Sequence, residues 1–443
     1  MYKKQSFEIH SEKVEHNSIM YLINEEKRSA GVIGCKKNLD NIIIPRSIKQ
    51  KSKEYNVTII LEDAFKYSLI KSVQFSSDSK IQIIDKNAFS NSKINSITIP
   101  PSIILIGEGA FYECLRFEKI EIPNDSKLQT IDKDAFFYSS IKSITIPSQL
   151  VELKEGWCNH TSKLTKITVS IQNPRYSCYE NKMIIGKTNI NQNNYDCLVF
   201  CVRDIQHIKI PNFIEHICSY SFDHCEQLER IEFQNDSKLR KIDKQAFSFV
   251  AIKSITIPSS VVSIGEGAFY SCKQLERIEF ATNSKLQTIG KYSFSYTKIK
   301  TITIPSSVVL IDDSAFYSCN QLERIEITND SKLQTIETNA FFNSAIESIK
   351  IPSQLIELKE GWCNHTAKLT KIAVNIQNPR YNCYENKVII GKTNIDQNNY
   401  DCIVFCARDT QHIKVPNFIE NIYPYSFDNC SKLQNIEFQD DSK

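Results

Sequence analysis

The stretch that decides the fold runs from Ile252 to Leu275 and has the sequence IKSITIPSSVVSIGEGAFYSCKQL. Near its start, Ile255 and Ile257 alternate with polar residues, which predicts a short strand with one buried face. Pro258 follows at once and cannot donate to a continuing ladder, so the strand ends there. A unit of this size cannot bury its own apolar face, and we therefore expect it to stack against similar units.

The aromatic residue of this unit recurs along the chain, usually after alanine and at steps of 21 to 25 residues, apart from two gaps of 65 residues. Both tryptophans of the chain occupy the same position of the repeat. The recurring residues are Phe65, Phe89, Phe111, Phe136, Trp157, Phe222, Phe247, Phe269, Phe294, Phe316, Phe341, Trp362 and Phe427. A strand motif, Leu/Ile-x-x-Ile-x-Ile/Phe, accompanies each unit. The pattern predicts a repeat solenoid of about sixteen rungs with a parallel β-sheet on one face.

A longer repeat is superimposed on these units, because residues 81–238 recur as residues 286–443 at an offset of 205. Two islands, 171–205 and 376–410, interrupt the units, and each is expected to form β-hairpins that project from the solenoid. We predict an N-terminal segment, 1–46, with a degenerate island and the first strand, followed by repeats over 47–443. The final IEFQDDSK matches residues 231–238, after which the first copy continues, so we expect a longer parent array or a truncated gene product.

The composition excludes several classes of function. The 54 Lys and Arg residues nearly balance the 51 Asp and Glu residues, for a net charge of +3, which disfavours a dedicated nucleic-acid binder. Only 11 of the 443 residues are glycine, so the glycine-rich loops that hold nucleotides are scarce. The first residues, MYKKQSFEIHSEKVEH, lack the apolar core of a secretory signal, and no apolar run is long enough to insert into a membrane.

The unit Ile-x-x-Ile-x-Ile-Pro-x-x-Val-x-x-Ile-Gly-x-x-Ala-Phe-x-x-Cys-x-x-Leu resembles the BspA-like class of leucine-rich repeats, and the NDSKLQTI units look most like its protist branch. The resemblance implies a right-handed superhelix with the parallel sheet on one face. It also implies a surface antigen of the kind that binds host proteins, matrix or other cells. No catalytic residue comes with the resemblance.

The chemistry-bearing motifs are weak. Gly186-Lys187-Thr188 ends like a phosphate-binding loop, but Asn181 stands where that loop needs its first glycine. The cysteines and histidines are scattered, so we predict no enzyme, no cofactor and no metal site. We expect reduced core thiols, and a disulfide from Cys178 to Cys197 or Cys201 is the alternative.

Two surfaces are candidates for binding. The first is the outer face of the predicted strands, whose charges either neutralise one another or select a protein partner. Its residues are Glu229, Arg230, Glu232, Lys253, Thr256, Glu276, Arg277, Glu279, Lys300, Thr303, Glu323, Arg324 and Glu326. The second is the pair of islands, which either bind a partner or only fill a gap in the stack. Their candidate contacts are Tyr176, Tyr179, Tyr195, Tyr381, Tyr384 and Tyr400.

The long solenoid favours a non-enzymatic adhesion module that binds a protein or a cell-surface or matrix ligand. Its place at the cell surface is implied by the resemblance alone, and the missing secretory signal argues against it. An intracellular leucine-rich-repeat scaffold for protein–protein interaction is the alternative. Neither hypothesis involves nucleic acid or direct insertion of this chain into a membrane.

Overall fold

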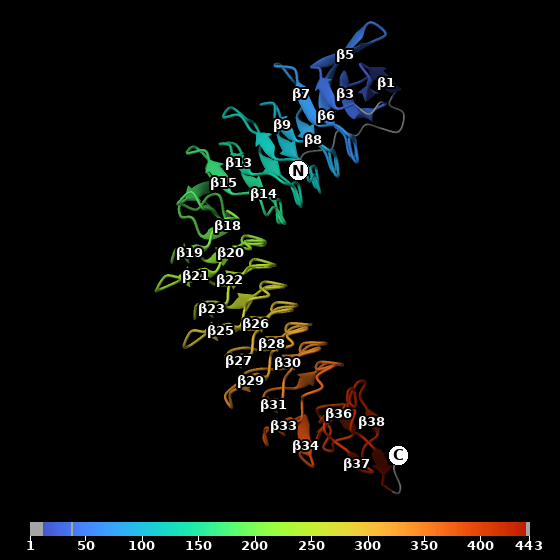
Figure 1. Cartoon of the computed structure of the whole chain (residues 1–443), viewed down its shortest axis with the longest axis vertical. Helices are drawn as coiled ribbons and strands as arrows, with labels where there is room; N and C mark the ends of the chain where they lie inside the picture. The colour runs from blue at the N-terminus through green and yellow to red at the C-terminus, as the bar shows by residue number, and fades with distance from the viewer. Residues whose placement is uncertain (1–11, 37–38, 440–443) are drawn as a thin grey trace. The chain divides into compact units, whose positions relative to one another are not determined.

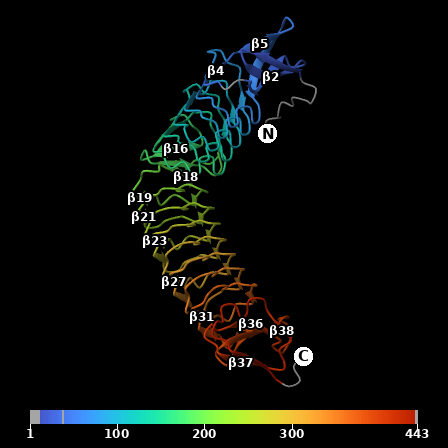
Figure 2. The ribbon, with the colours of Figure 1, turned by 45° about the vertical axis from the view of Figure 1, so that its right-hand side comes forward.

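The computed structural model describes residues 12–36 and 39–439, and all regular elements in these ranges are β-strands. Accordingly, these residues contain no helix that could cross a bilayer. The chain forms two compact units, Met1–Ile205 and Gln206–Lys443. Each unit is a stack of rungs (Figures 1 and 2). Two of the sequence features lie largely or partly outside the described ranges. These are the N-terminal stretch that was searched for a secretory signal and the final IEFQDDSK, of which the last four residues are not described.

The predicted parallel β-solenoid is confirmed, with about 18 turns rather than sixteen. The strand motif undercounts the turns because the islands lack it yet also occupy turns. In the second island, for example, the strand Cys402–Cys406 pairs in parallel with Asn421–Ile422, the short strand of the next turn.

The predicted strands form a parallel ladder on one side of each unit. Neighbouring strands lie in register, so Ile255 stands beside Ile278 and Ile302 beside Ile325. In the first unit the strands are β4 (Asn41–Ile44), β7 (Ser72–Phe75), β9 (Ser96–Thr98), β11 (Lys119–Glu121), β13 (Ser143–Ile146) and β15 (Lys166–Val169). In the second unit they are β19 (His207–Ile210), β21 (Arg230–Phe233), β23 (Ser254–Ile257), β25 (Arg277–Phe280), β27 (Thr301–Ile304), β29 (Arg324–Ile327), β31 (Ser348–Ile351), β33 (Lys371–Val374), β37 (His412–Val415) and β39 (Asn435–Phe438).

A second parallel ladder consists of two-residue strands that the sequence analysis did not identify. In the first unit these are β8 (Ile83–Ile84), β10 (Leu105–Ile106), β12 (Thr130–Ile131) and β14 (Glu152–Leu153). In the second unit they are β20 (His216–Ile217), β22 (Lys241–Ile242), β24 (Ser263–Ile264), β26 (Thr288–Ile289), β28 (Leu310–Ile311), β30 (Thr335–Ile336), β32 (Glu357–Leu358) and β38 (Asn421–Ile422). Two residues are too few for a detectable period of two.

Antiparallel strands occur at the start of the described chain and in the islands. The N-terminal set consists of β1 (Glu12–His16), β2 (Ile19–Asn24), β3 (Ser29–Cys35), β5 (Ser47–Gln50) and β6 (Lys53–Ile60). The island strands are β16 (Tyr176–Tyr179), β17 (Met183–Gly186) and β18 (Cys197–Cys201), and then β34 (Tyr381–Tyr384), β35 (Val388–Gly391) and β36 (Cys402–Cys406).

The turns that carry the repeated aromatic residue form a third ladder. Around Phe294, the N–H groups of Tyr292, Phe294 and Tyr296 donate to carbonyls of the next rung at 3.0, 2.8 and 2.9 Å. Tyr292 and Tyr296 have positive φ, at 53° and 61°. The same two positions are left-handed in nearly every turn, usually without glycine. Each such residue costs roughly 1 kcal/mol, and the hydrogen bonds between rungs offset this cost.

The repeated phenylalanines form a buried column inside each unit. Phe269, Phe294 and Phe316 are fully buried, and their rings stack with centroids 5.3 and 5.4 Å apart. At each island a tryptophan ends this stacking, because the Phe341 and Trp362 rings meet edge to face at 87°.

We expect Asn343→Val to lower the midpoint of urea unfolding, because a β-branched residue is poorly tolerated at the φ of 52° found there. The expected loss is about 1 to 2 kcal/mol. Asn343 is exposed, so changed packing does not complicate the measurement. The control, Asn343→Gly, should stay within about 0.5 kcal/mol of the wild type. Equal midpoints for the two variants would contradict the need for a left-handed residue.

Candidate functional site

The strands of the second unit bring the predicted surface residues onto one face. Because β21 to β29 are in register with their hydrogen-bonded partners, Thr256 lies beside Glu279, and Thr303 lies beside Glu326. Their side chains alternate with the buried isoleucines of the same strands. The outward orientation that the sequence predicts for these positions is therefore observed.

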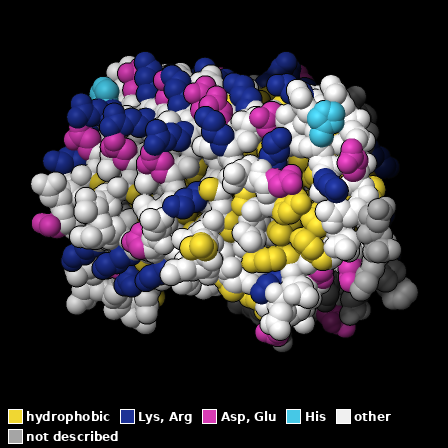
Figure 3. Space-filling view, turned by 90° about the horizontal axis from the view of Figure 1, so that it is seen from below, with side chains coloured by type: hydrophobic (Ala, Val, Ile, Leu, Met, Phe, Trp, Pro, Cys, Tyr) yellow, Lys and Arg dark blue, Asp and Glu magenta, His cyan; other side chains and the backbone are white. Residues whose placement is uncertain are grey.

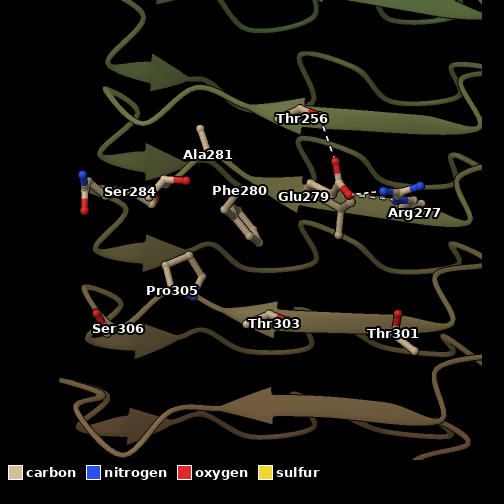
Figure 4. Close-up of a pocket in the computed structure, with 13 residues that line it drawn as sticks. Thr256, Arg277, Glu279, Phe280, Ala281, Ser284, Thr301, Thr303, Pro305 and Ser306 are labelled. Atoms are coloured by element: carbon tan, nitrogen blue, oxygen red, sulfur yellow. Dashed lines mark hydrogen bonds and ion pairs between the residues drawn. The ribbon is translucent and has the colours of Figure 1, made fainter.

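The charges on this face largely pair with one another. Arg230 and Glu232 form an ion pair at 2.6 Å, and Arg324 and Glu326 form one at 2.8 Å. Glu279 accepts hydrogen bonds from Arg277 on its own strand and from Thr256 on the neighbouring strand (Figure 4). The Arg277 contact is the largest cause that lowers the pKa of Glu279. Figure 3 shows basic and acidic side chains next to one another at several places on the surface. The self-paired ladder is thus present on this face.

The same face has two adjoining hollows, of about 990 and 640 Å³, which share Thr256 and Ala281. Eight of the thirteen predicted residues line them, namely Glu229, Arg230, Glu232, Lys253, Thr256, Arg277, Glu279 and Thr303. In Figure 4, Pro305 and Ala281 lie toward one end of the smaller hollow, and Arg277 lies toward the other. Each hollow therefore combines charged groups with an apolar portion.

The expectation that the islands project from the stack is wrong for the last two strands of each island, which are buried. Every residue of β36 is buried, and its Phe405 ring lies 5.8 Å from the ring of Trp362. Consecutive apolar residues in these strands bury both faces, which the hairpin pattern alone does not reveal. The alternative interpretation, that the islands fill a gap in the stack, agrees with this packing.

The burial also removes two predicted island contacts. Tyr176 and Tyr381 are only 4% and 3% exposed. Their hydroxyls accept hydrogen bonds from the backbone N–H groups of Leu153 and Leu358. They cannot contact a partner, so the prediction is wrong for both. Four tyrosines remain partly exposed, namely Tyr179, Tyr195, Tyr384 and Tyr400.

The loop that resembles a phosphate-binding motif is closed by its own side chains. Both the backbone N–H and the hydroxyl of Thr188 donate to the Asp196 carboxylate, at 2.8 and 2.5 Å. Thr393 and Asp401 make the same contacts in the second island. A carboxylate of the chain therefore already accepts the hydrogen bonds that these donors could offer a phosphate.

The cysteine that stands three residues after the repeated phenylalanine, as in Cys272 and Cys319, has a structural role. The thiols of Cys272 and Cys319 donate to the carbonyls of Phe247 and Phe294, one rung away, at 2.9 and 3.0 Å. Cys178 and Cys383 are free thiols, so the alternative of an island disulfide is not realised. Burial raises the pKa of Cys272 to about 12 and that of Cys319 to about 11.

One cysteine differs from this set, and the sequence analysis did not single it out. The Sγ atom of Cys430 lies 3.7 Å from Nη1 of Arg408, whose side chain is buried. A hydrogen bond from the Cys406 thiol, together with the Arg408 guanidinium, holds the pKa of Cys430 below its ordinary value. Cys430 is partly exposed, unlike Cys272 and Cys319.

A further feature that the sequence analysis missed is a row of rings on the outer side of the turns. In the second unit the rings of Phe249, Tyr270, Tyr296, Tyr317 and Phe342 follow one another with centroids 4.6 to 5.8 Å apart. These residues stand one or two positions after the buried phenylalanine, so their spacing varies. A search for one fixed period therefore does not find them.

We expect iodoacetamide at pH 7 to modify Cys430 in the native protein well before Cys272 or Cys319. The pKa of Cys430 is lowered, so its reactive thiolate forms near neutral pH, whereas the two raised pKa values keep the buried thiols protonated. Peptide mass spectrometry after timed quenching measures the three rates. In urea all three should react alike, and equal rates in the native protein would contradict the assignment.

Comparisons with known proteins agree with this architecture. A family model described as a BspA type leucine rich repeat region matches in six copies, over residues 58–185, 188–323, 287–403 and 381–443. A leucine-rich repeat protein from Bacteroides ovatus has a similar solved structure, with 21% identity, coverage of 97% of this chain and 98% of that chain, and a TM-score of 0.56.

A second solved structure, of a leucine-rich repeat protein from Eubacterium ventriosum, is 18% identical and has a TM-score of 0.59. It covers 80% of this chain and 94% of its own. Curated proteins yielded no match. The match to the family model extends over most of the solenoid. The chain therefore belongs to the family of BspA-type leucine-rich repeat proteins.

Proposed function

We propose that this chain is a non-enzymatic binding protein that holds a protein partner along the strand face of its second unit. The observation that carries the proposal is the pair of adjoining hollows, of about 990 and 640 Å³, on that face. They extend over five consecutive strands, from His207 on β19 to Thr303 on β27. A surface that repeats over several rungs suits an extended protein segment.

The side chains around the hollows favour a partner with both polar and apolar groups. Phe233 and Pro258 contribute apolar surface to the larger hollow, and Phe280 and Pro305 contribute it to the smaller one. The Arg–Glu pairs beside them are neutral as pairs, so they attract no charged ligand over long distances. They act at contact, where a partner with mismatched charges would break a pair without replacing it.

Binding at the hollows can be tested by removing one ion pair at a time. We expect Arg277→Ala combined with Glu279→Ala to weaken capture of a matrix protein at least about tenfold, since both residues line the smaller hollow. Surface plasmon resonance over a panel of immobilised matrix proteins, including collagen and laminin, measures the change.

The matched control is Arg324→Ala combined with Glu326→Ala, an identical pair type on β29 that lines neither hollow. This control should bind like the wild type. Equal losses from the two double variants, or no loss from either, would contradict binding at the hollows.

We also propose that the protein is displayed on the cell surface, as the resemblance to surface antigens implies. An antibody to the repeat should stain intact cells that express the full protein. Staining that appears only after permeabilisation would contradict surface display and would favour the alternative of an intracellular scaffold.

A further inference from the structure

The second island brings two thiols together on adjacent rungs, which the regular rungs do not do. Cys430 occupies the same turn position as Cys272 and Cys319, three residues after the repeated phenylalanine. Those two cysteines recur two rungs apart, or about 9.6 Å at ~4.8 Å per strand, which is too far for a disulfide. Cys406 lies on the rung directly before Cys430, since its backbone N–H donates to the Ser426 carbonyl at 2.9 Å.

The Cys430 sulfur makes different contacts from its counterparts in the regular rungs. The thiols of Cys272 and Cys319 donate to carbonyls at 2.9 and 3.0 Å, whereas Cys430 Sγ lies 3.8 and 3.9 Å from two carbonyl oxygens of the preceding rung. Cys430 accepts hydrogen bonds from the Cys406 thiol and from Nη1 of Arg408, the latter at 3.7 Å. It therefore accepts where its counterparts donate, as a thiolate would.

Arg408 is a buried cation without a carboxylate partner. The residue is only 3% exposed, and its guanidinium carbon lies 4.4 Å from the centre of the Phe405 ring. Nη1 donates to the Ser426 carbonyl at 3.2 Å, and the buried Nε has no hydrogen-bond partner. Among the described residues, no ion pair includes Arg408. A buried charge is costly unless an opposite charge offsets it, so a thiolate at Cys430 stabilises this guanidinium.

The other ionisable groups around the pair leave Cys430 as the nucleophile. Burial raises the pKa of Cys363 to about 12, so that thiol stays protonated. The hydrogen bond to Cys430 is the largest cause that raises the pKa of Cys406, which therefore keeps the proton that it donates. The Asp428 carboxylate opposes the thiolate, but it already accepts two hydrogen bonds, at 2.7 and 2.9 Å. Only Cys430 combines a lowered pKa with partial exposure.

A thiolate with a second thiol beside it can pass from a sulfenic acid to a disulfide. We propose that a hydroperoxide oxidises Cys430 and that Cys406 then forms a disulfide with it. Neither cysteine lines the hollows on the strand face, so the proposal is independent of binding there.

The reaction has two steps. In the first, the Cys430 thiolate attacks one peroxide oxygen, so that an S–O bond forms, the O–O bond breaks, and the departing alkoxide takes a proton from water. In the second, the Cys406 sulfur attacks the sulfenic sulfur, the S–O bond breaks, and the hydroxide leaves with the Cys406 proton as water. The two cysteines lose two electrons in total, and the hydroperoxide gains them.

The test treats the full, reduced chain with hydrogen peroxide at pH 7 and then blocks the remaining thiols with iodoacetamide. Chymotrypsin cleaves after Phe405 and so separates Cys402 from Cys406, which lets peptide mass spectrometry identify the cross-linked pair. We expect the Cys406–Cys430 disulfide to form at least about tenfold faster than any oxidation product of Cys319.

Two variants separate the roles of the thiol and the guanidinium. Cys406→Ala should form no disulfide, so dimedone should trap the sulfenic acid on Cys430, more slowly because a hydrogen bond is lost. Arg408→Met should raise the pKa of Cys430 and move the pH profile of its oxidation to higher pH. The matched control is Arg203→Met, the counterpart in the first copy, which is 2% exposed and should leave the profile at Cys430 unchanged.

Three outcomes would overturn the proposal, and the first two need only the wild type. One is that Cys430 is oxidised no faster than Cys319. Another is that oxidised Cys430 pairs with Cys363, or with a second chain, instead of Cys406. The last is that Arg408→Met and Arg203→Met shift the profile at Cys430 equally.

Discussion

The structure depends on one constraint, which is that a rung can satisfy its backbone and bury its apolar face only against another rung. Three hydrogen-bonded ladders meet this need in each unit: the four-residue strands, the two-residue strands and the turns around the buried phenylalanine. The turn ladder is the costly one, because it places residues such as Tyr292 and Tyr296 in a left-handed conformation. Since glycine is scarce, the hydrogen bonds between rungs must compensate for that strain repeatedly.

The islands show how the chain interrupts such a column without exposing it. Trp362 meets the last stacked phenylalanine with its edge, and Phe405 of β36 then covers the indole. Arg408 lies over the Phe405 ring at 4.4 Å and remains buried. The last two strands of each island are therefore part of the core.

Much of the fold could be predicted from the sequence, because isoleucine spacing and the repeated aromatic residue report directly on burial. Phe294 and Ile302 are buried as their positions in the unit require. The outward charges were also predictable from the alternation along each strand. The hollows were not, since they depend on how loops such as residues 281–284 stand beside the next rung.

Other features escaped because their signal is not periodic. The two-residue strands are too short to show an alternation, and the outer row of rings, which is Phe249, Tyr270, Tyr296, Tyr317 and Phe342, shifts between two positions of the turn. Tyr381 is buried, and its hydroxyl accepts a hydrogen bond from Leu358, 23 residues earlier, a contact that no local pattern encodes. Each of these features is a relation between rungs and not a property of one rung.

The alternation of long and short units has a consequence for any elongated ligand of this protein. Because equivalent side chains return every second rung, as Arg230 and Arg277 do in the two hollows, a ligand displaced by one such step meets nearly the same chemistry. Several binding registers then have similar free energies, and two equal registers already contribute RT ln 2, or about 0.4 kcal/mol, of mixing entropy. Single-molecule tracking along the solenoid axis would record this as stepwise sliding instead of a single dwell position.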